Sequence, residues 1–312
     1  MTHATPGEDA AAYHRDFQSN EEGVVIGVLE GETSTFGQAG PLKKDGPPVD
    51  ADTLFEIGSI TKTFTGVLLA DAVLKGKATL EDSIAKHLPA DLLPTDSPLR
   101  SVTLLDLATH TSGLPRLPAN LDKGADPNDP YAHYSVEKLY EYLRAFKESD
   151  FEKRGEMSYS NLGVGLLGNL LERIAGKPYE ELIAETIFTP LGMKSSFIQR
   201  KPGVFPASHL ERLATGHSGG KPVAHWHLNA FCGAGAIVSS ARDMLTYAGA
   251  YWSPQTPESL KQAMLFAIKP QRKGMGLGWF IGGEGLNHDG GTGGFRSELR
   301  VNPEKKTASL KF

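Results

Sequence analysis

An apolar stretch turns directly into a strong helix signal at residues 53–65, which read Thr53-Leu-Phe-Glu-Ile-Gly-Ser-Ile-Thr-Lys-Thr-Phe-Thr65. The helix signal continues to Lys75, because apolar side chains recur on one stripe: Phe64, Val67, Leu68 and Ala72. Ser59 and Lys62 lie at the junction, one helical turn apart, so a helix places the hydroxyl and the amine on the same face. A lysine kept neutral by removal from water can accept a serine proton, which makes this pair a candidate nucleophile and base.

The Ser-x-x-Lys spacing is a weak signal by itself. It recurs at Ser135/Lys138 and at Ser218/Lys221. Ser135 precedes a helix signal and is better explained as its N-cap, whereas Ser218 lies in a glycine-rich turn in which no helix would align the pair. Ser59 fits an N-cap serine equally well, and only other motifs in the chain can separate the two interpretations.

Outside this stretch, the chain has a strand-rich beginning and end and a helical middle. Strands are predicted at Val24–Glu30, Ser34–Gln38, Gly276–Ile281, Leu286–Asp289, Ser297–Asn302 and Thr307–Phe312, with strand and glycine signals also at Gly233–Val238. Helices are predicted at Glu8–Gln18, Thr61–Lys75, Val102–Thr109, Val136–Phe146, Gly163–Ala175, Tyr179–Ile187 and Ala241–Tyr251. We therefore expect an α/β sheet domain made of residues 1–78 and 197–312, with a helical domain, residues 79–196, inserted into it.

Composition excludes several classes of function. The 312 residues include 32 Lys and Arg and 37 Asp and Glu, a net charge of −5 with no basic block, which argues against nucleic acid or an anionic membrane as a partner. The longest apolar runs fall far short of the ~20 residues that a membrane span needs. A single cysteine, Cys232, excludes an intramolecular disulfide framework and a multi-cysteine zinc site.

The first residues, Met1-Thr-His-Ala-Thr-Pro6, contain neither a basic nor an apolar region of the kind found in secretory signals. The compartment stays open between the cytoplasm and a periplasmic or secreted location from which a signal peptide has been removed.

Two further motifs contain residues suited to proton transfer and substrate binding. Tyr159-Ser-Asn161 is the only Tyr-x-Asn in the chain, and a tyrosine near a lysine can relay a proton while an asparagine amide holds a lysine and a substrate carbonyl. His288-Asp-Gly290 is followed by Gly291-Thr-Gly-Gly-Phe295. Glycines that follow a strand let a substrate lie against the strand edge and leave N–H groups free as oxyanion donors.

Two other patterns are rejected as functional signals. Gly163–Gly168 matches G-x-G-x-x-G, but it follows a polar segment instead of a buried strand, so its glycines more simply allow close helix packing. His225 and His227 flank Trp226, but no H-E-x-x-H motif or nearby carboxylate completes a metal site. We expect this segment to line a pocket or lie on the surface.

Taken together and in order, the motifs at Ser59–Lys62, Tyr159–Asn161 and His288–Gly290 resemble the three active-site motifs of a serine β-lactamase-like group. That group comprises class C β-lactamases, DD-peptidases, D-aminopeptidases and family VIII esterases, and is penicillin-binding-protein-like. The intervening stretches are similar as well: residues 53–65, Leu107–Pro115, Pro190–Met193 and Gly290–Phe295. The resemblance covers residues from about 23 to 312. It implies a β-lactamase/transpeptidase-like α/β (α+β) fold, a five-stranded antiparallel sheet flanked by helices, with an inserted all-helical domain and the active site between them.

The resemblance also implies catalytic roles. Ser59 would be the nucleophile, Lys62 and Tyr159 would share the base and acid work, and Asn161 would orient Lys62 and the substrate. His288 would lie on the strand edge near the leaving group. The reaction would be acyl transfer through a serine ester followed by attack of water, with no metal and no cofactor.

The same resemblance implies binding residues. The N–H groups of Ser59 and Gly291 would form the oxyanion hole, and we expect Gly290, Thr292 and Trp226 to contact the substrate. The expected partner is a small ester, amide or β-lactam.

The sequence departs from this group in two places. β-Lactamases of the group usually have lysine where this chain has His288, and histidine is uncharged at neutral pH unless its pKa is raised. The histidine form is found among DD-peptidases, D-aminopeptidases and esterases. The group also normally ends with a helix packed on the sheet, whereas this sequence stops at Phe312 in its last strand. We therefore expect a partly apolar, exposed sheet face that favours self-association.

The sequence thus predicts a serine hydrolase that acts through an acyl-enzyme on esters or small D-configured amides or peptides, with little or no turnover of β-lactams. Two alternatives remain open. One is a class C β-lactamase, and the other is a non-hydrolytic penicillin-recognition module that is acylated and stays blocked as a sensor.

Overall fold

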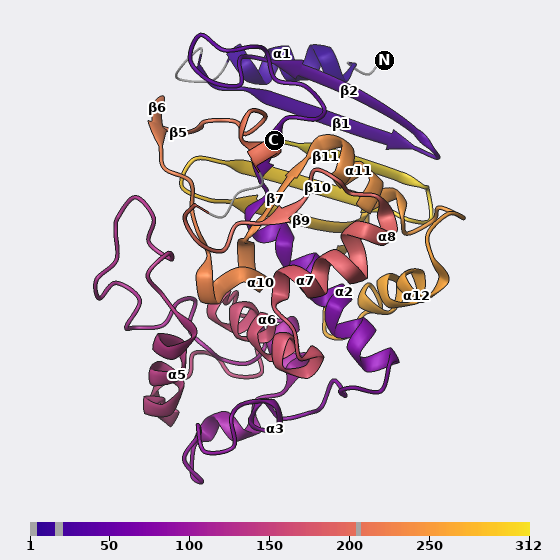
Figure 1. Ribbon diagram of the computed structural model, residues 1–312. Helices are drawn as coiled ribbons and strands as arrows, with labels where there is room; N and C mark the ends of the chain where they lie inside the picture. Colours follow the sequence, from indigo (N-terminus) through magenta and orange to yellow (C-terminus); the bar gives the residue numbers. More distant parts are fainter. Residues whose placement is uncertain (1–4, 16–20, 204–206) are drawn as a thin grey trace.

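The first and last strands of the chain pair with each other in one antiparallel sheet (Figure 1). The computed structural model describes residues 5–15, 21–203 and 207–312. The strand order is β2-β1-β11-β10-β9-β8, where β1 is Val24–Glu30, β2 Thr33–Ala39, β8 Phe280–Gly282, β9 Gly285–Gly291, β10 Arg296–Asn302 and β11 Thr307–Lys311. Ile26 of β1 is opposite Lys311 of β11, so the N-terminal hairpin joins the sheet through the C-terminal strand.

The fold class predicted from the sequence is confirmed, but the sheet contains six strands instead of five. The sixth, β8, has only three residues and pairs with β9 at the edge. The strand predicted at Gly276–Ile281 is therefore wrong over its first part. Residues 276–279 cannot join the sheet because their N–H groups are used elsewhere: Leu277 donates to Ala267 O and Gly278 donates to Ala108 O, at 2.8 and 3.0 Å.

A second, smaller sheet contains the strand that precedes Ser59 in the chain. It consists of β3 Leu54–Glu56, β7 Ile237–Ser240 and β4 Phe197–Ile198, with β7 in the middle. The strand and glycine signals at Gly233–Val238 divide between β7 and a short helix, α10, Cys232–Gly235. A separate hairpin is formed by β5 Gly216–Ser218 and β6 Lys221–Val223.

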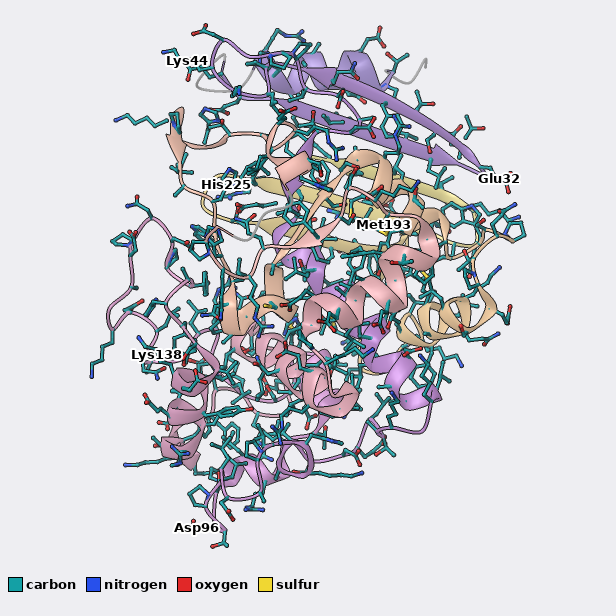
Figure 2. The ribbon with its side chains drawn as sticks, viewed as in Figure 1. Glu32, Lys44, Asp96, Lys138, Met193 and His225 are labelled. Carbon is teal, nitrogen blue, oxygen red and sulfur yellow. The ribbon has the colours of Figure 1, made fainter. Side chains whose placement is uncertain are left out.

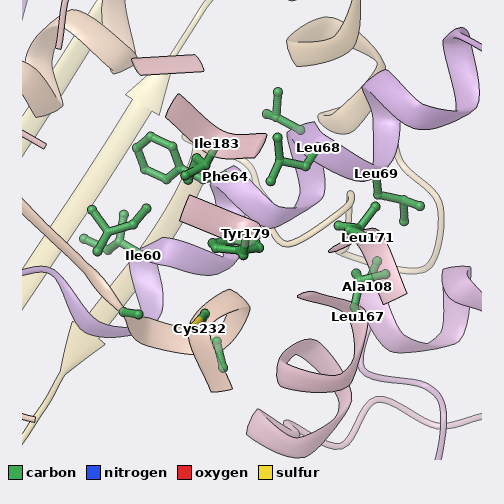
Figure 3. Close-up of a cluster of buried hydrophobic side chains, with 14 of the residues drawn as sticks. Ile60, Phe64, Leu68, Leu69, Ala108, Leu167, Leu171, Tyr179, Ile183 and Cys232 are labelled. Carbon is green, nitrogen blue, oxygen red and sulfur yellow. The ribbon is translucent and has the colours of Figure 1, made fainter. Parts of the chain in front are cut away.

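Helix α2, Thr61–Leu74, runs through the centre of the core (Figure 3). Every residue from Thr61 to Ala72 is buried, so the apolar stripe predicted from the sequence is only part of the buried surface. Phe64 of α2 stacks on Tyr247 of helix α11, Ala241–Gly249, with ring centroids 3.8 Å apart. The buried Thr65 hydroxyl donates to Gly233 O at 2.7 Å, which satisfies a polar group inside the core. The helix that contains Lys62 is thus packed on all sides.

The other helices agree with the sequence at most positions. They are α1 Pro6–Arg15, α3 Ile84–His87, α4 Leu104–Ala108, α5 Val136–Ala145, α6 Asn161–Ala175, α7 Tyr179–Ile183, α8 Thr189–Leu191, α9 Ala207–Leu210 and α12 Glu258–Ala267, with α7 continuing as a π-helical turn over Ala184–Phe188. Single 3-10 turns occur at η1 Gly58–Ile60, η2 Pro98–Ser101, η3 Glu148–Asp150 and η5 Asn229–Phe231. The short helices α3, α8 and α9 and the longer α12 were not predicted, and the part of the predicted N-terminal helix beyond residue 15 lies outside the described residues.

The competing Ser-x-x-Lys pairs are explained by local structure. Ser135 is the N-cap of α5 and accepts a hydrogen bond from the Lys138 N–H at 3.4 Å; Lys138 is labelled on that helix in Figure 2. Ser218 and Lys221 face each other across the β5–β6 turn. A further pair, Ser83 and Lys86, starts with another N-cap serine, at α3. Ser59 differs because its lysine lies on α2, whose surroundings bury the whole side chain.

The glycines of the G-x-G-x-x-G match bring two helices together, as the sequence predicts. A Cβ atom at Gly168 of α6 would lie 3.0 Å from the Gly233 Cα of α10, and one at Gly233 would lie 2.9 Å from the Gly168 Cα. The two backbones are therefore in contact, and the dinucleotide-binding interpretation has no structural basis.

Helix α1 covers one face of the sheet near β1 and β2 (Figure 1). Ala10 of α1 packs against Val24 and Ile26 in a small apolar cluster of its own. Because Ile26 and Lys311 are paired across the sheet, α1 and the side chain of Lys311 share this face, and Lys311 Nζ lies 3.9 Å from the centroid of the Tyr13 ring.

The rest of that face is charged. Arg300 contacts Asp289 and Glu298 at 2.6 and 3.0 Å, and Lys311 lies 3.6 Å from Glu298. The expectation of an exposed apolar sheet face is therefore wrong, because the outward positions of β9, β10 and β11 carry ion-paired side chains. The argument for self-association that rested on such a face fails with it.

Within the described residues, no helix is long and apolar enough to cross a membrane. Helices α3 and α5 lie at the end of the molecule away from the main sheet, and α6 lies beside α2 (Figure 1). The division into residues 1–78 with 197–312 and residues 79–196 stays a prediction.

The contact between α6 and α10 generates a stability prediction. We expect Gly233→Ala to lower the free energy of unfolding by about 1–3 kcal/mol, because the added methyl group must push α10 away from α6. Gly283→Ala is the matched control, since a Cβ atom there meets nothing within 4 Å, and it should change stability by less than about 0.5 kcal/mol. Denaturant unfolding measures both. Equal effects of the two substitutions would contradict the packing role.

Candidate active site

Ser59 lies in the 3-10 turn η1, and this turn comes directly before helix α2. This places its hydroxyl at the positive end of a helix, where developing negative charge is favoured. The preceding Gly58 has a φ of 49°, and a Cβ atom there would lie 2.6 Å from the Gly291 N atom. Glycine at position 58 therefore allows the end of β9 to approach Ser59, which brings two predicted site residues together.

Lys62 points at Ser59 from the next turn. Its Nζ atom lies 2.9 Å from Ser59 Oγ and donates to Ala234 O at 2.7 Å. The side chain is fully buried, and among the described residues no carboxylate lies within ion-pair distance of it. Burial, with a smaller contribution from the nearby Arg116 cation, lowers the pKa of Lys62 well below its ordinary value. This shift favours the neutral amine, which is the form that can accept the Ser59 proton.

Tyr159 lies beside the same lysine. Lys62 Nζ is 4.9 Å from the centroid of the Tyr159 ring, and the Arg116 guanidinium is 5.2 Å from it. Burial raises the pKa of Tyr159 to about 12, although a hydrogen bond with Ser59 and the Arg116 charge act in the opposite direction. The phenol is therefore protonated at neutral pH. It is able to donate a proton to a substrate atom, and Lys62 is the stronger candidate for the base.

Asn161 is the first residue of α6, which Ser160 caps by accepting the Gly163 N–H at 2.9 Å. The side chain lines the narrow cavity together with Tyr131, and its Oδ1 atom is buried and has no partner within the described structure. An unpaired acceptor in a buried position is available for an N–H or ammonium donor. The structure does not place the Asn161 amide on Lys62, so its expected role in orienting that lysine stays a prediction.

His288 lies in the middle of β9, buried, with its Nδ1 atom 2.8 Å from Asp289 O. A carbonyl oxygen only accepts hydrogen bonds, so Nδ1 carries the proton and Nε2 presents a lone pair. Nε2 is buried and has no partner among the described residues. Burial, assisted by Lys62, lowers the pKa of His288 to about 3. His288 is therefore uncharged over the physiological range and acts as a hydrogen-bond acceptor.

His110 is a site residue that the sequence analysis did not single out. Its ring lies against Tyr159 with centroids 4.4 Å apart, and its Nδ1 atom accepts the Ser160 N–H at 3.1 Å. The residue is buried and has a φ of 57°, which is uncommon for histidine. Burial lowers its pKa well below the usual value. A neutral His110 thus fixes the position of Tyr159 through both the ring and the following N–H group.

Two cavities meet at Ser59. One, of about 490 Å³, is lined by Tyr159, His288, Gly290 and Gly291, together with Arg116 and Phe280. The other is narrow, about 30 Å³, and is lined by Asn161, Gly291, Thr292 and Trp226 with the aromatic rings of Tyr131 and Phe231. All the predicted catalytic and binding residues other than the buried Lys62 therefore line one of two cavities that share Ser59. A larger cavity of about 870 Å³, beside α5 and α6, contains none of them.

The histidines on either side of Trp226 are held by carboxylates that are distant in sequence. His225 Nδ1 lies 2.8 Å from Glu56 Oε1, and His227 Nδ1 lies 2.6 Å from Asp129 Oδ2. The prediction that no carboxylate lies near these histidines is therefore wrong for the folded protein, because both carboxylates come from distant parts of the sequence. Among the described residues no three such groups come together to hold a metal ion. The two contacts fix Trp226 over the narrow cavity; His225 is labelled in Figure 2.

Four site residues gave no separate signal in the sequence: His110, Tyr131, Arg116 and Phe280. His110 falls within the Leu107–Pro115 stretch that carries the family resemblance, and its positive φ could not be read from the residue type. The other three come from loops and a short edge strand, where neither periodicity nor capping marks a residue as functional.

Similarity to known proteins extends over almost the whole chain. The family profile described as Beta-lactamase matches residues 9–310. The chain belongs to the beta-lactamase family. A Pseudomonas fluorescens protein named Beta-lactamase is 29% identical to this family member over 295 residues, covering 92% of this chain and 77% of that protein. The D-alanyl-D-alanine-carboxypeptidase/endopeptidase AmpH of Escherichia coli (strain K12) is 27% identical over 327 residues, covering 97% and 82%.

Solved structures agree with this assignment. A class C beta-lactamase from Rhodobacter sphaeroides superposes with a TM-score of 0.81 at 26% identity, covering 97% of this beta-lactamase-family chain and 92% of the other. A beta-lactamase/D-alanine carboxypeptidase from Pseudomonas syringae gives a TM-score of 0.80 at 22% identity, covering 97% and 91%, and shares the fold. The family and the fold class inferred from the sequence are both confirmed.

The neutral state of Lys62 generates a prediction about stability and pH. If the folded-state pKa is lowered, the unfolded chain binds one more proton between that pKa and the ordinary lysine value, so stability rises with pH across this window. We expect the difference in unfolding free energy, wild type minus Lys62→Met, to increase as pH rises from 6 to 9. The increase should be at most about 1.4 kcal/mol per pH unit. Denaturant unfolding at a series of pH values measures the difference, and parallel curves would mean that Lys62 is charged in the folded protein.

Proposed function

We propose that this protein is a serine hydrolase that forms a covalent acyl-enzyme on Ser59. The observation that carries the proposal is the 2.9 Å contact between Ser59 Oγ and the Nζ atom of a fully buried Lys62. A surface lysine would be protonated and could not accept a proton, whereas burial supplies the neutral amine that activates a serine.

In the first half-reaction, Ser59 Oγ attacks the carbonyl carbon of the substrate while its proton moves to Lys62 Nζ. The tetrahedral intermediate then collapses, and the bond from the carbonyl carbon to the leaving oxygen or nitrogen breaks. The leaving atom takes up a proton from the Tyr159 hydroxyl. Lys62 then returns the proton that it received from Ser59 to the Tyr159 oxygen. This division of work is supported by the pKa of about 12 for Tyr159, which makes the phenol a donor, and by the lowered pKa of Lys62.

The N–H groups of Ser59 and Gly291 are proposed as the oxyanion hole. Support comes from the contact of Gly58 with Gly291 and from the position of Ser59 before the first turn of α2. Two donors and a helix N-terminus aimed at the same oxygen favour the charge that develops in the transition state.

In the second half-reaction, a water molecule attacks the acyl carbon and gives a proton to Lys62, and the bond to Ser59 Oγ breaks as that oxygen is reprotonated. The buried acceptors Asn161 Oδ1 and His288 Nε2 would bind N–H groups of an amide substrate on either side of the reacting carbonyl. No metal or cofactor enters these steps.

We further propose that the substrates are esters or small D-configured amides or peptides, and that β-lactams are turned over weakly. The uncharged His288, where β-lactamases of this group usually have lysine, supports this choice over a class C β-lactamase. The activities for which the relatives are named, beta-lactamase and D-alanyl-D-alanine-carboxypeptidase/endopeptidase, favour amide bonds as a second candidate class.

Burst and steady-state kinetics with p-nitrophenyl esters and nitrocefin distinguish the candidates. A burst followed by turnover of esters supports the proposal, and rapid turnover of nitrocefin supports a β-lactamase. A stoichiometric burst with no turnover of either substrate would identify a penicillin-recognition module instead.

The choice of nucleophile is tested by labelling with a fluorophosphonate or a fluorescent penicillin. Ser59→Ala should abolish labelling, because the covalent bond forms on this hydroxyl. Ser135→Ala and Ser218→Ala remove the serines of the other Ser-x-x-Lys pairs and should label like the wild type. Labelling of the Ser59→Ala variant would show that another serine is the nucleophile.

The shared proton path is tested by a double-mutant cycle. Lys62→Met and Tyr159→Phe should each lower the acylation rate by about 10²- to 10⁴-fold. Since both act on the same proton, the double variant should lose much less than the product of the two effects. If the rate losses of the two single variants multiply in the double variant, Lys62 and Tyr159 act independently and the proposed shared proton path is wrong.

A further inference from the structure

Arg116 is held beside the catalytic groups by its own backbone. Its carbonyl oxygen accepts the N–H groups of Asn161 and Leu162, both at 3.1 Å, which are first-turn donors of α6. These donors have no partner inside the helix, so the bond fixes residue 116 to the helix end that also carries the Tyr159–Asn161 motif. The position of Arg116 relative to Tyr159 is therefore determined by the fold, although its side chain is exposed.

The guanidinium group of Arg116 lines the 490 Å³ cavity next to Ser59 and His288. It lies 5.2 Å from the centroid of the Tyr159 ring, within the range of a cation–π contact. No carboxylate of the described residues lies within ion-pair distance of it. Asp289, which lines the same cavity, has its carboxylate 2.6 Å from Arg300 on the outer face of the sheet. Arg116 thus presents free hydrogen-bond donors to the cavity.

Among the residues that line this cavity, Arg116 is the permanent cation. Burial lowers the pKa of Lys62, His110 and His288, which favours the neutral form of each of these basic groups around Tyr159. Arginine does not deprotonate in proteins, and its planar group matches a carboxylate with two parallel hydrogen bonds. Arg116 is therefore the cation that lines this cavity, next to the uncharged His288.

We propose that Arg116 is a specificity-determining residue that binds a carboxylate on the leaving-group part of the substrate. The inference rests on the proposed serine hydrolase function and narrows its substrate class. The leaving group belongs in the cavity of Arg116 because the proton donor Tyr159 lines it, whereas the aromatic side chains Tyr131 and Trp226 line the other cavity, which suits an apolar acyl group. Substrates are then amides, peptides or esters that release an anionic fragment, in preference to neutral esters.

A matched pair of aryl esters tests the proposal. Phenyl acetates with a meta-carboxylate or a meta-carboxamide on the leaving group present the same reacting carbonyl and differ in charge. We expect Arg116→Gln to lower the ratio of kcat/KM for the carboxylate ester to kcat/KM for the carboxamide ester on the order of 10-fold. Arg116→Lys should retain part of the preference, and higher salt should reduce it in the wild type but not in Arg116→Gln.

Arg144→Gln is the charge-matched control, because Arg144 is exposed on α5 and lines neither cavity that meets at Ser59. It should leave the ratio of the two kcat/KM values unchanged. An equal fall for both esters in Arg116→Gln would overturn the inference and indicate that Arg116 acts through the pKa of Lys62. No fall for either ester would also overturn it. Failure of the wild type to form an acyl-enzyme with either ester would instead reject the proposed function, and the inference with it.

Discussion

The neutral amine of Lys62, held out of water against Ser59, is the constraint on which the site depends. A buried lysine is costly, and the surroundings must both exclude a compensating carboxylate and supply acceptors for the amine, as Ala234 O does at 2.7 Å. The burial of α2 from Thr61 to Ala72 fits the same need, because an exposed face near Lys62 would admit water to the amine. The close contact of α10 with α6 keeps that acceptor in place, since α10 contains Ala234.

The two histidines beside Tyr159 are also uncharged. His110 and His288 both lie near the tyrosine ring, yet each has one ring nitrogen committed to a backbone group, and each is uncharged. Their free nitrogens differ: His110 Nε2 carries a proton, and His288 Nε2 has a lone pair. The two histidines therefore offer a hydrogen-bond donor and an acceptor without adding charge. Arg116, which lines the same cavity as Tyr159 and His288, is the residue proposed to select substrates by their charge.

The fold class could be predicted from the sequence, and Ser59 and Lys62 could be proposed as nucleophile and base, because a strand-to-helix junction and one-turn spacing are local properties; the other motifs were needed to prefer this interpretation over an N-cap serine. Tyr159 and His288 needed the family resemblance, since their motifs have ordinary local explanations. His110 and Arg116 were missed because their importance comes from contacts with residues distant in sequence and from an unusual backbone angle. The sheet face at β9 to β11 was mispredicted because the alternation in Glu298, Arg300 and Lys311 was not considered as a charge network.

The pairing of β1 with β11 also determines when the enzyme can assemble. The hairpin of β1 and β2 leaves the ribosome long before its neighbour in the sheet, Thr307–Lys311, is synthesised. Contacts between segments so far apart in sequence close late and slowly, because a long loop must be ordered before they form. Until then the apolar side of Val24–Glu30 lacks its partner strand and is open to wrong association. The hairpin of a nascent chain is therefore without its partner strand until Thr307–Lys311 has been synthesised.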